Sequence, residues 1–172
     1  MKILLGEIPQ GHSVIDRRES AAAIDIKDWV MPKADVHVVL DADRRGQQVT
    51  MRGLAELDVE YSCARCLREF GGALAAPVLV LADRRGSDDP RDEEALEQEG
   101  AVIYHEGVEI DLGPSIRDAL ILEVPQVVLC RPECRGLCSS CGQDRNEGEC
   151  NCAPGGMDPR WEQLRQLNRE KT

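Results

Sequence analysis

The sequence predicts an α+β fold in which a mainly antiparallel β-sheet, or a partly open barrel, is closed by one helix. Two observations support this fold class. Apolar and polar residues alternate in most segments between residues 34 and 82, whereas apolar residues recur at helical spacing after residue 113. In addition, six of the eight cysteines lie after residue 129, which predicts a small cysteine-rich module with a terminal helix behind the sheet.

The first expected strands form a hairpin. Ala34–Leu40 is one strand, and the loop Asp41–Gln48, which contains Gly46, is expected to connect it to the next. That next strand, Val49–Tyr61, shows the cleanest alternation in the chain, with Leu54 as its exception. The apolar face of this strand carries Val49, Met51, Gly53, Ala55, Leu57, Val59 and Tyr61.

Three further strands follow, with an acidic segment between them. Leu74–Ala82 predicts a strand, and Pro77 within it favours an edge or a bulge. Asp83–Glu99 then holds eight acids and three arginines, a net charge of −5, which predicts a solvated and poorly ordered loop; attraction of a basic partner is the alternative role. Ala101–Tyr104 and Val108–Leu112 predict two short strands.

Two helices complete the expected elements. Gly113–Val124 has apolar residues at helical spacing, with Pro114 at the first helical position and Pro125 forcing the end. Asp158-Pro159 then makes a good start for a terminal helix, whose apolar stripe would consist of Trp161, Leu164 and Leu167.

These elements divide the chain into two expected domains. A length of 172 residues is enough for one main domain and a small appended module. We expect a β-rich core domain over residues 1–125, which includes the acidic loop 83–99. Residues 126–172 are expected to form the cysteine-rich module and the C-terminal helix.

Charge and hydropathy exclude several classes of function. The formal net charge is −11, so the chain is not a generic nucleic-acid binder, because such binding depends on lysine and arginine displacing counterions. No apolar segment approaches the about 20 residues of a membrane span, and residues 1–12 lack the apolar run of a secretory signal. We therefore expect a cytoplasmic protein without a membrane partner, in a compartment where disulfides are disfavoured.

The cysteine spacing predicts metal binding. Cys63-Ala-Arg-Cys66 falls between two expected strands, at the tip of a hairpin, and Cys138-Ser-Ser-Cys141 repeats the same spacing before Gly142. Two thiolates separated by two residues in a tight turn can face one ion, so the C-terminal part is expected to be a zinc-knuckle module. Thiol redox chemistry is a weaker interpretation, because it needs the motif at a helix N-terminus; the spacing also lacks an iron–sulfur pattern.

Eight cysteines suggest two structural Zn²⁺ sites of four ligands each. The simplest division places Cys138, Cys141, Cys150 and Cys152 in one local site, and joins Cys63 and Cys66 to Cys130 and Cys134 in the other. The second site would hold the segment after the helix against the hairpin tip. The alternative moves one ligand between the sites, for example leaving Cys130 as a buried free thiol.

No catalytic arrangement is visible in the sequence. His12, His37 and His105 have no ligand spacing to a cysteine, and closed sites of four cysteines leave no open position for a catalytic water. We therefore expect neither an enzyme nor a small-molecule substrate. Five arginines beside the cysteines are candidate contacts to RNA or to a partner, although nearby acids make a solvated shell the alternative: Arg65, Arg68, Arg131, Arg135 and Arg145.

Five motifs follow one another along the chain: Cys63-Ala-Arg-Cys66-Leu67, Leu122-Glu-Val-Pro125, Cys130-Arg-Pro-Glu-Cys134-Arg-Gly-Leu-Cys138-Ser-Ser-Cys141-Gly142, Cys150-Asn-Cys152 and Asp158-Pro159-Arg160-Trp161 with Leu164 and Leu167. In this order, they resemble the YceD family of large ribosomal RNA subunit accumulation proteins. The resemblance covers roughly residues 50–167, and its most specific part is the C-terminal cysteine cluster.

The resemblance implies a non-enzymatic factor that supports the accumulation or assembly of large-subunit (23S) ribosomal RNA. Its partner would be a large-subunit ribosomal protein or precursor large-subunit RNA. Because some members of the family lack the last cysteines, the resemblance also supports the pairing of Cys63 and Cys66 with Cys130 and Cys134. Two alternatives stay open: a zinc-stapled scaffold for a partner unrelated to ribosomes, and a thiol-redox protein.

Overall fold

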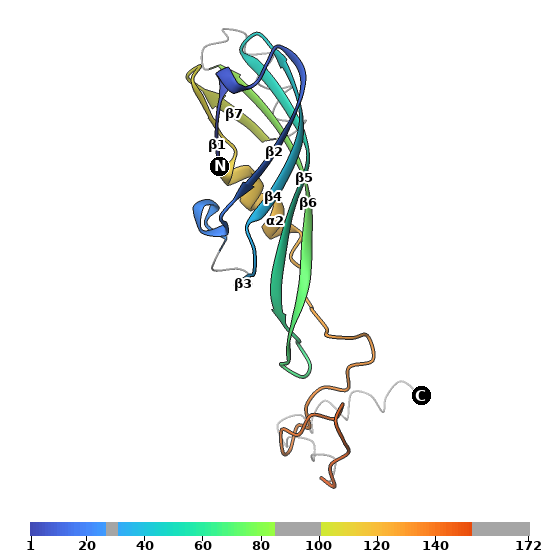
Figure 1. Cartoon of the computed structure of the whole chain (residues 1–172). Helices are drawn as coiled ribbons and strands as arrows, with labels where there is room; N and C mark the ends of the chain where they lie inside the picture. The colour runs from blue at the N-terminus through green and yellow to red at the C-terminus, as the bar shows by residue number, and fades with distance from the viewer. Residues whose placement is uncertain (27–30, 85–100, 153–172) are drawn as a thin grey trace, which may run out of the picture. The chain divides into compact units, whose positions relative to one another are not determined.

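β-Strands are the main secondary structure of the described residues, as Figure 1 shows. The structure is a computed structural model, and it describes residues 1–26, 31–84 and 101–152. Within them the chain forms two compact units: the first contains residues 1–61 and 69–127, and the second contains residues 62–68 together with the segment from residue 128 onward. Compact units are defined by packing and not by independent folding, so the two domains expected from the sequence stay a prediction.

The first unit is built on a six-stranded sheet with the strand order β2-β4-β5-β6-β7, in which β3 also pairs with β5. A second, two-stranded sheet pairs β1 with β8. Most pairings are antiparallel, and β6–β7 is parallel. The strands are β1 (Lys2–Leu4), β2 (Gly11–Glu19), β3 (Met31–Pro32), β4 (Val36–Arg45), β5 (Gln48–Ser62), β6 (Glu69–Arg84), β7 (Ala101–His105) and β8 (Glu109–Asp111).

The predicted alternation determines which face of the sheet is buried. On β4, Val36, Val38 and Leu40 are each 0% exposed, whereas Leu54 on β5 is 49% exposed, as the pattern predicts. Of the predicted inward face of β5, Gly53 and Tyr61 are half-buried and the other five residues are at most 2% exposed. Each fully buried valine or leucine side chain stabilises the fold by about 1.5–3 kcal/mol relative to an exposed one. One buried face per strand is therefore enough to specify the register of these strands.

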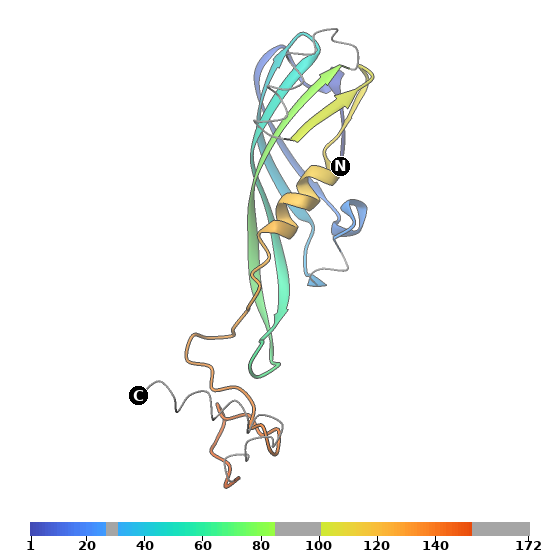
Figure 2. The ribbon, with the colours of Figure 1, turned by 180° about the vertical axis from the view of Figure 1, so that it is seen from behind.

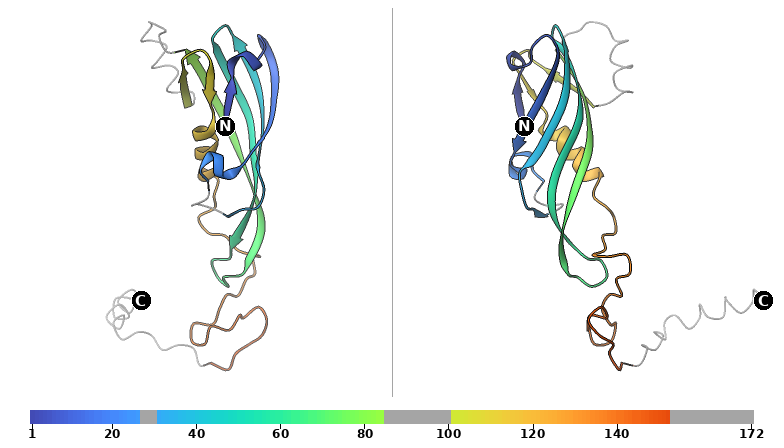
Figure 3. Two further views of the ribbon diagram at one scale, coloured as in Figure 1. Left: turned by 60° about the vertical axis from the view of Figure 1, so that its left-hand side comes forward. Right: turned by 45° about the vertical axis from the view of Figure 1, so that its right-hand side comes forward.

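The α-helix α2 (Gly113–Leu122) lies against one face of the sheet, as Figures 2 and 3 show, and packs on β6. Its inward residues Ile116 and Leu120 are 0% and 1% exposed. Pro114 stands in its first turn as predicted, directly after Gly113, the first helical residue. Two short 3₁₀-helices, η1 (Leu5–Glu7) and η2 (Ala21–Ile24), complete the described elements of this unit.

The hairpin between β4 and β5 corrects one prediction. The loop expected over Asp41–Gln48 is wrong in extent, because β4 continues to Arg45 and β5 begins at Gln48. Strand pairing continues because Ala42 is fully buried and the Arg44 guanidinium donates hydrogen bonds to the carbonyl oxygens of Leu5 and Ile8, at 2.6 and 2.7 Å. Only two residues remain for the turn, and the first, Gly46, has the positive φ of 65° that such a turn requires.

Four other expectations concern the acidic loop, the terminal helix, the position of Pro77 and closure of the sheet into a barrel. Asp83 and Arg84 belong to β6, so the acidic loop starts later than expected; its residues 85–99, and the helix expected from Asp158, lie outside the described residues. Pro77 lies within β6, and the pairing with β7 starts only at Val80, three residues later. Among the described strands the order ends at β2 and β7, so the sheet does not close into a barrel.

Three strands of this unit, β1, β2 and β3, were not predicted. β2 exposes most of its side chains and so shows little apolar alternation, and β1 and β3 are only three and two residues long.

Within the described parts of the chain, no helix combines the length and the apolar character needed to cross a lipid bilayer.

Gly53 on β5 gives a test of this packing. A Cβ at this position would lie 2.0 Å from the carbonyl oxygen of Val39 on the adjacent strand, so Gly53→Ala forces the two backbones apart. We expect Gly53→Ala to lower the free energy of unfolding by about 2 kcal/mol or more, measured by urea denaturation. The control is Gly71→Ala on β6, where a Cβ meets nothing within 4 Å and the change should be under about 0.5 kcal/mol. Equal stability of the two variants would contradict the close approach of β4 and β5.

Candidate metal centre

The eight cysteines of the second unit gather into two groups of four. We call the first the proximal site, made of Cys63, Cys66, Cys130 and Cys134, and the second the distal site, made of Cys138, Cys141, Cys150 and Cys152. In each group the four sulfur atoms lie within 4.8 Å of one another. These are the same two groups into which the simplest reading of the sequence divides the cysteines, and Cys130 lies with its three partners.

The first two proximal ligands lie on a tight turn between β5 and β6. The backbone N–H of Arg65 donates to Cys63 Sγ at 3.5 Å, and the backbone N–H of Leu67 donates to the Cys63 carbonyl at 2.9 Å. The Cys63 N–H in turn donates to the Arg68 carbonyl at 2.9 Å. This turn leaves both sulfur atoms on the same side, and it places Leu67 in the left-handed region at φ 57°.

The first two distal ligands lie on a second turn with the same hydrogen bonds. The backbone N–H groups of Ser140 and Gly142 donate to the sulfur and the carbonyl of Cys138, at 3.5 and 2.9 Å, and the Cys138 N–H donates to the Gln143 carbonyl at 2.8 Å. Gly142 occupies the position of Leu67 and has φ 75°. The two CxxC motifs therefore form the same knuckle twice.

Backbone hydrogen bonds connect the two stretches of chain that make the proximal site. Ala64 N–H donates to the Val128 carbonyl at 2.8 Å, and Leu137 N–H donates to the Arg65 carbonyl at 3.1 Å. The Arg65 guanidinium also donates to the Cys134 carbonyl at 2.8 Å. The four thiols are thus held by the backbone around them and not only by one another.

The two sites differ in exposure. In the proximal site Cys63, Cys66 and Cys134 are 0%, 7% and 2% exposed. In the distal site only Cys138 is buried, while Cys141 and Cys152 are exposed and Cys150 is intermediate. Solvent and small chelators therefore reach the distal sulfur atoms more easily than the proximal ones.

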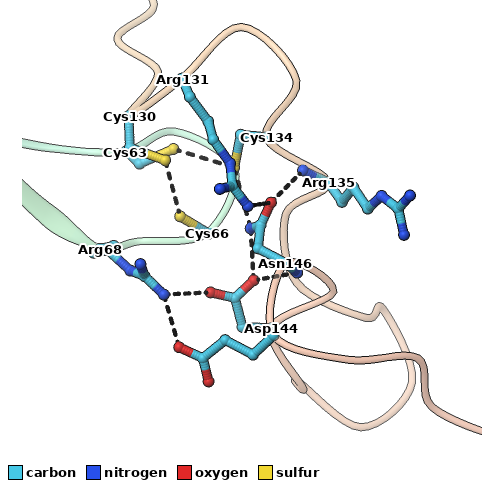
Figure 4. Close-up of polar contacts among 10 residues, drawn as sticks. Cys63, Cys66, Arg68, Cys130, Arg131, Cys134, Arg135, Asp144 and Asn146 are labelled. Carbon is cyan, nitrogen blue, oxygen red and sulfur yellow. Dashed lines mark hydrogen bonds and ion pairs between the residues drawn. The ribbon is translucent and has the colours of Figure 1, made fainter.

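The sulfur geometry fits a tetrahedral metal ion. The distances Cys63 Sγ to Cys134 Sγ and Cys66 Sγ to Cys130 Sγ are both 3.7 Å (Figure 4). Four thiolates about 2.3 Å from one ion lie about 3.8 Å apart, whereas a disulfide needs about 2.05 Å. All eight cysteines are free, and a set of four soft thiolates suits zinc or iron. Each group can hold one metal ion and leaves no ligand position for substrate.

In each site, backbone N–H groups lower the pKa of a thiol. The backbone N–H groups of Cys130 and Cys66 lower the pKa of Cys63 to about 6, and those of Cys141 and Ser140 lower the pKa of Cys138 to about 6. Other thiols in each group show the opposite shift. Burial raises the pKa of Cys130 to about 12, and a hydrogen bond with Cys141 raises that of Cys152 to about 12. Crowded thiols compete for negative charge, and a bound cation removes that competition.

Within the described residues, the structure separates the five candidate arginines by what their side chains contact. Besides Arg65, the Arg68 guanidinium contacts carboxylate oxygens of Asp144 and Glu147, at 3.3 and 2.7 Å. Arg131 donates to the side chain of Asn146 at 2.8 Å. These three arginines therefore stabilise the second unit.

The side chains of the other two candidate arginines make fewer polar contacts within the described residues. The Arg135 guanidinium lies 3.8 Å from the exposed carboxylate of Glu149, a weak ion pair. The Arg145 guanidinium makes no hydrogen bond or ion pair in the described part of the chain. Both line a surface hollow beside the distal ligand Cys150 and a second hollow beside Asn146, so these are the arginines available to a ligand.

Sequence reasoning missed the role of Asn146. Its side-chain N–H₂ donates to Cys134 Sγ at 3.4 Å, and its side-chain oxygen accepts from Arg131 and from the Arg135 backbone N–H, the latter at 2.9 Å (Figure 4). The spacing Asp144-x-Asn146 between the distal cysteines is the only signal for it in the sequence, and that signal is weak.

Comparison with known proteins identifies the family. A family model described as "Large ribosomal RNA subunit accumulation protein YceD" matches residues 51–168, which include all eight cysteines. The chain belongs to the YceD family. This match confirms the resemblance inferred from the cysteine motifs, including its extent along the chain.

Individual relatives agree with this assignment. An uncharacterised protein of Mycobacterium tuberculosis (strain H37Rv) is 33% identical over 134 residues, which cover 76% of this chain and 62% of the relative. Proteins named "Large ribosomal RNA subunit accumulation protein YCED homolog 1, chloroplastic" are 24% identical in Zea mays and in Arabidopsis thaliana, covering 72% and 81% of this chain. The chain spans about 62% of the length of the mycobacterial relative and about half of the plant relatives. No solved structure matches this YceD family chain significantly.

Gly136, between the two sites, gives a test of the backbone contacts. Its φ is 70°, and a Cβ there would lie 2.9 Å from the Arg65 carbonyl oxygen, the acceptor for Leu137 N–H. Gly136→Ala should therefore cost about 2 kcal/mol or more locally and speed hydrogen exchange of the Leu137 amide.

The matched control is Gly142→Ala. This residue also has a positive φ, 75°, but a Cβ there meets nothing within 4 Å, so only the backbone term of about 1 kcal/mol applies. Leu137 exchange that responds equally to both substitutions would contradict the close contact between Gly136 and Arg65.

Proposed function

We propose that this chain is a non-enzymatic, zinc-binding factor that supports the accumulation or assembly of large-subunit (23S) ribosomal RNA in the cytoplasm. The observation that carries the proposal is the membership of the YceD family combined with two complete sets of four cysteines. Both sets have the sulfur spacing of a closed structural site, which supports a binding role for the protein and not a catalytic one.

Zinc is the proposed ion in both sites. Four cysteine thiolates form a site that zinc commonly occupies, and the paired knuckles supply the N–H groups that stabilise bound thiolates. The zinc ions act structurally: they hold the segment after residue 128 on the hairpin tip 62–68, within one compact unit.

The proposed principal partner is a basic protein of the large ribosomal subunit. A formal charge of −11 disfavours tight binding to RNA duplexes and favours a basic surface. A local RNA contact is then proposed for Arg135 and Arg145, because these two guanidinium groups are the ones that the second unit leaves available. Arg65, Arg68 and Arg131 are proposed to act only through their contacts inside this unit.

Metal content tests the first half of the proposal. Protein purified from cells without added metal should carry close to two Zn²⁺ per chain and no iron, because both sets of sulfur atoms can hold an ion. Elemental analysis by mass spectrometry measures this directly. A ratio near one would reject one of the two sites, and a ratio near zero would reject zinc binding.

Co-sedimentation tests the second half. The protein should sediment with precursor large subunits, and a complex with a basic large-subunit protein should survive nuclease treatment of the lysate. Loss of all ribosomal association after nuclease, together with tight binding of the purified protein to ribosomal RNA at physiological salt, would contradict the protein-first contact. Absence from precursor subunits would instead favour a scaffold unrelated to ribosomes.

The same co-sedimentation experiment, carried out with variants, tests the proposed arginine contact. Arg135→Glu/Arg145→Glu should weaken association with precursor particles and lower its salt dependence by about 0.7–0.9 in log–log slope per lost phosphate contact. The control is Arg18→Glu/Arg52→Glu, which changes charge equally at two exposed arginines of β2 and β5. If the control weakens association as much, the effect is one of net charge and not of these two residues.

A further inference from the structure

The segment between the second and third distal cysteines also belongs to the surroundings of the proximal site. We call residues 143–147 the connecting loop; it follows Cys141 and precedes Cys150. Its Asn146 donates to Cys134 Sγ, a proximal sulfur atom, at 3.4 Å (Figure 4). One stretch of chain is therefore closed by the distal ligands while it contacts a proximal ligand.

The hydrogen bonds of Asn146 are complete and determine the orientation of its amide. The N–H₂ group donates to Cys134 Sγ and to Asp144 Oδ1, the second at 2.6 Å, and the oxygen accepts from Arg131 and from the Arg135 backbone. An amide has two donor hydrogens and two acceptor lone pairs, so all four positions are used. The reversed amide would place its oxygen against the sulfur and the carboxylate, and both contacts would be repulsive.

Other contacts hold the connecting loop to the proximal knuckle. Asp144 accepts from the Asn146 backbone at 2.8 Å, and its other oxygen lies 3.3 Å from Arg68, directly after the first knuckle. The Arg145 N–H donates to the Gly136 carbonyl at 2.9 Å, and Asp144 forms a β-bridge with Leu137. Together with the ion pair between Glu147 and Arg68, these contacts fix the loop on both sides of Asn146.

The distal ion would control how well this arrangement is maintained. When Cys138 and Cys141 share an ion with Cys150 and Cys152, the ion closes the connecting loop and restricts the conformations of Asn146. Without that ion, the loop gains conformational freedom, and holding the N–H group against Cys134 costs more. Partners that orient a metal ligand typically change metal affinity by about 10- to 100-fold.

We propose that the two metal sites load cooperatively, and that Asn146 is the positioning residue through which an occupied distal site raises the metal affinity of the proximal site. This inference rests on the proposed binding of zinc to both sites. Because coupling between two binding sites is reciprocal, an occupied proximal site raises the affinity of the distal site by the same factor. The more exposed distal site is thus not an independent appendage.

The test measures the zinc affinity of the proximal site in the full chain by competition with a chromophoric chelator. Cys150→Ser/Cys152→Ser removes the distal site, and it should weaken proximal binding by about 10- to 100-fold. Asn146→Ala with the distal site intact should weaken it to a similar extent. Combining both changes should add little to either, because they remove the same interaction.

A matched control and a second readout make the result specific. Asn151→Ala removes an exposed asparagine between Cys150 and Cys152, and it should leave proximal affinity unchanged. Substituting Co²⁺ for zinc reports the ligand field: Asn146→Ala should shift the cobalt–thiolate absorption of the proximal site, whereas a role limited to the fold of the loop would leave it in place.

The outcomes separate this inference from the proposed function. Two zinc ions bound with a proximal affinity that does not respond to loss of the distal site would overturn the coupling and leave zinc binding intact. Multiplicative losses from Asn146→Ala and Cys150→Ser/Cys152→Ser would also overturn it, because the two changes would then act separately. Failure to bind two zinc ions at all would reject the metal proposal before this question arises.

Discussion

The four thiols of the proximal site are the constraint on which the second unit depends. They bring together two stretches of chain, residues 62–68 and the segment from residue 128 onward, which are separated in the sequence by three described strands, a helix and the acidic segment. Backbone hydrogen bonds from Ala64 and Leu137 support the junction, but the described part of this unit holds few buried apolar residues. A unit with so small an apolar core needs another source of stability, and a metal ion held by four thiols would supply it.

The sequence predicted the parts of the fold that depend on a periodic pattern. The strand Val49–Tyr61 and the helix after Gly113 were recognisable because each buries one face and exposes the other. β2 was missed because most of its side chains are exposed, so pairing with β4 leaves no alternation to detect. The β4–β5 turn was placed too early because Asp41 and Asp43, which belong to the outward face of a strand, resemble loop residues in the sequence.

In the candidate site, too, features set by residues close in sequence were predictable, whereas contacts between residues distant in sequence were not. CxxC spacing is local, so it predicted both knuckles, and the remaining cysteines could then be assigned by proximity in sequence. The contact between Asn146 and Cys134 depends on tertiary packing, and no spacing rule indicates it. The arginines were recognised as a group, but which of them are used inside the unit followed only from their distances to Cys134, Asp144 and Asn146.

The long separation between the two halves of the proximal site also has a consequence during translation. Cys66 and Cys130 are 64 residues apart, so the hairpin tip leaves the ribosome well before its partners have been synthesised. Until then, its two thiols can be coordinated only incompletely, and they are exposed to oxidants and to competing metals. The nascent chain therefore passes through an interval in which the strands of the hairpin can pair but the set of four proximal thiols is still incomplete.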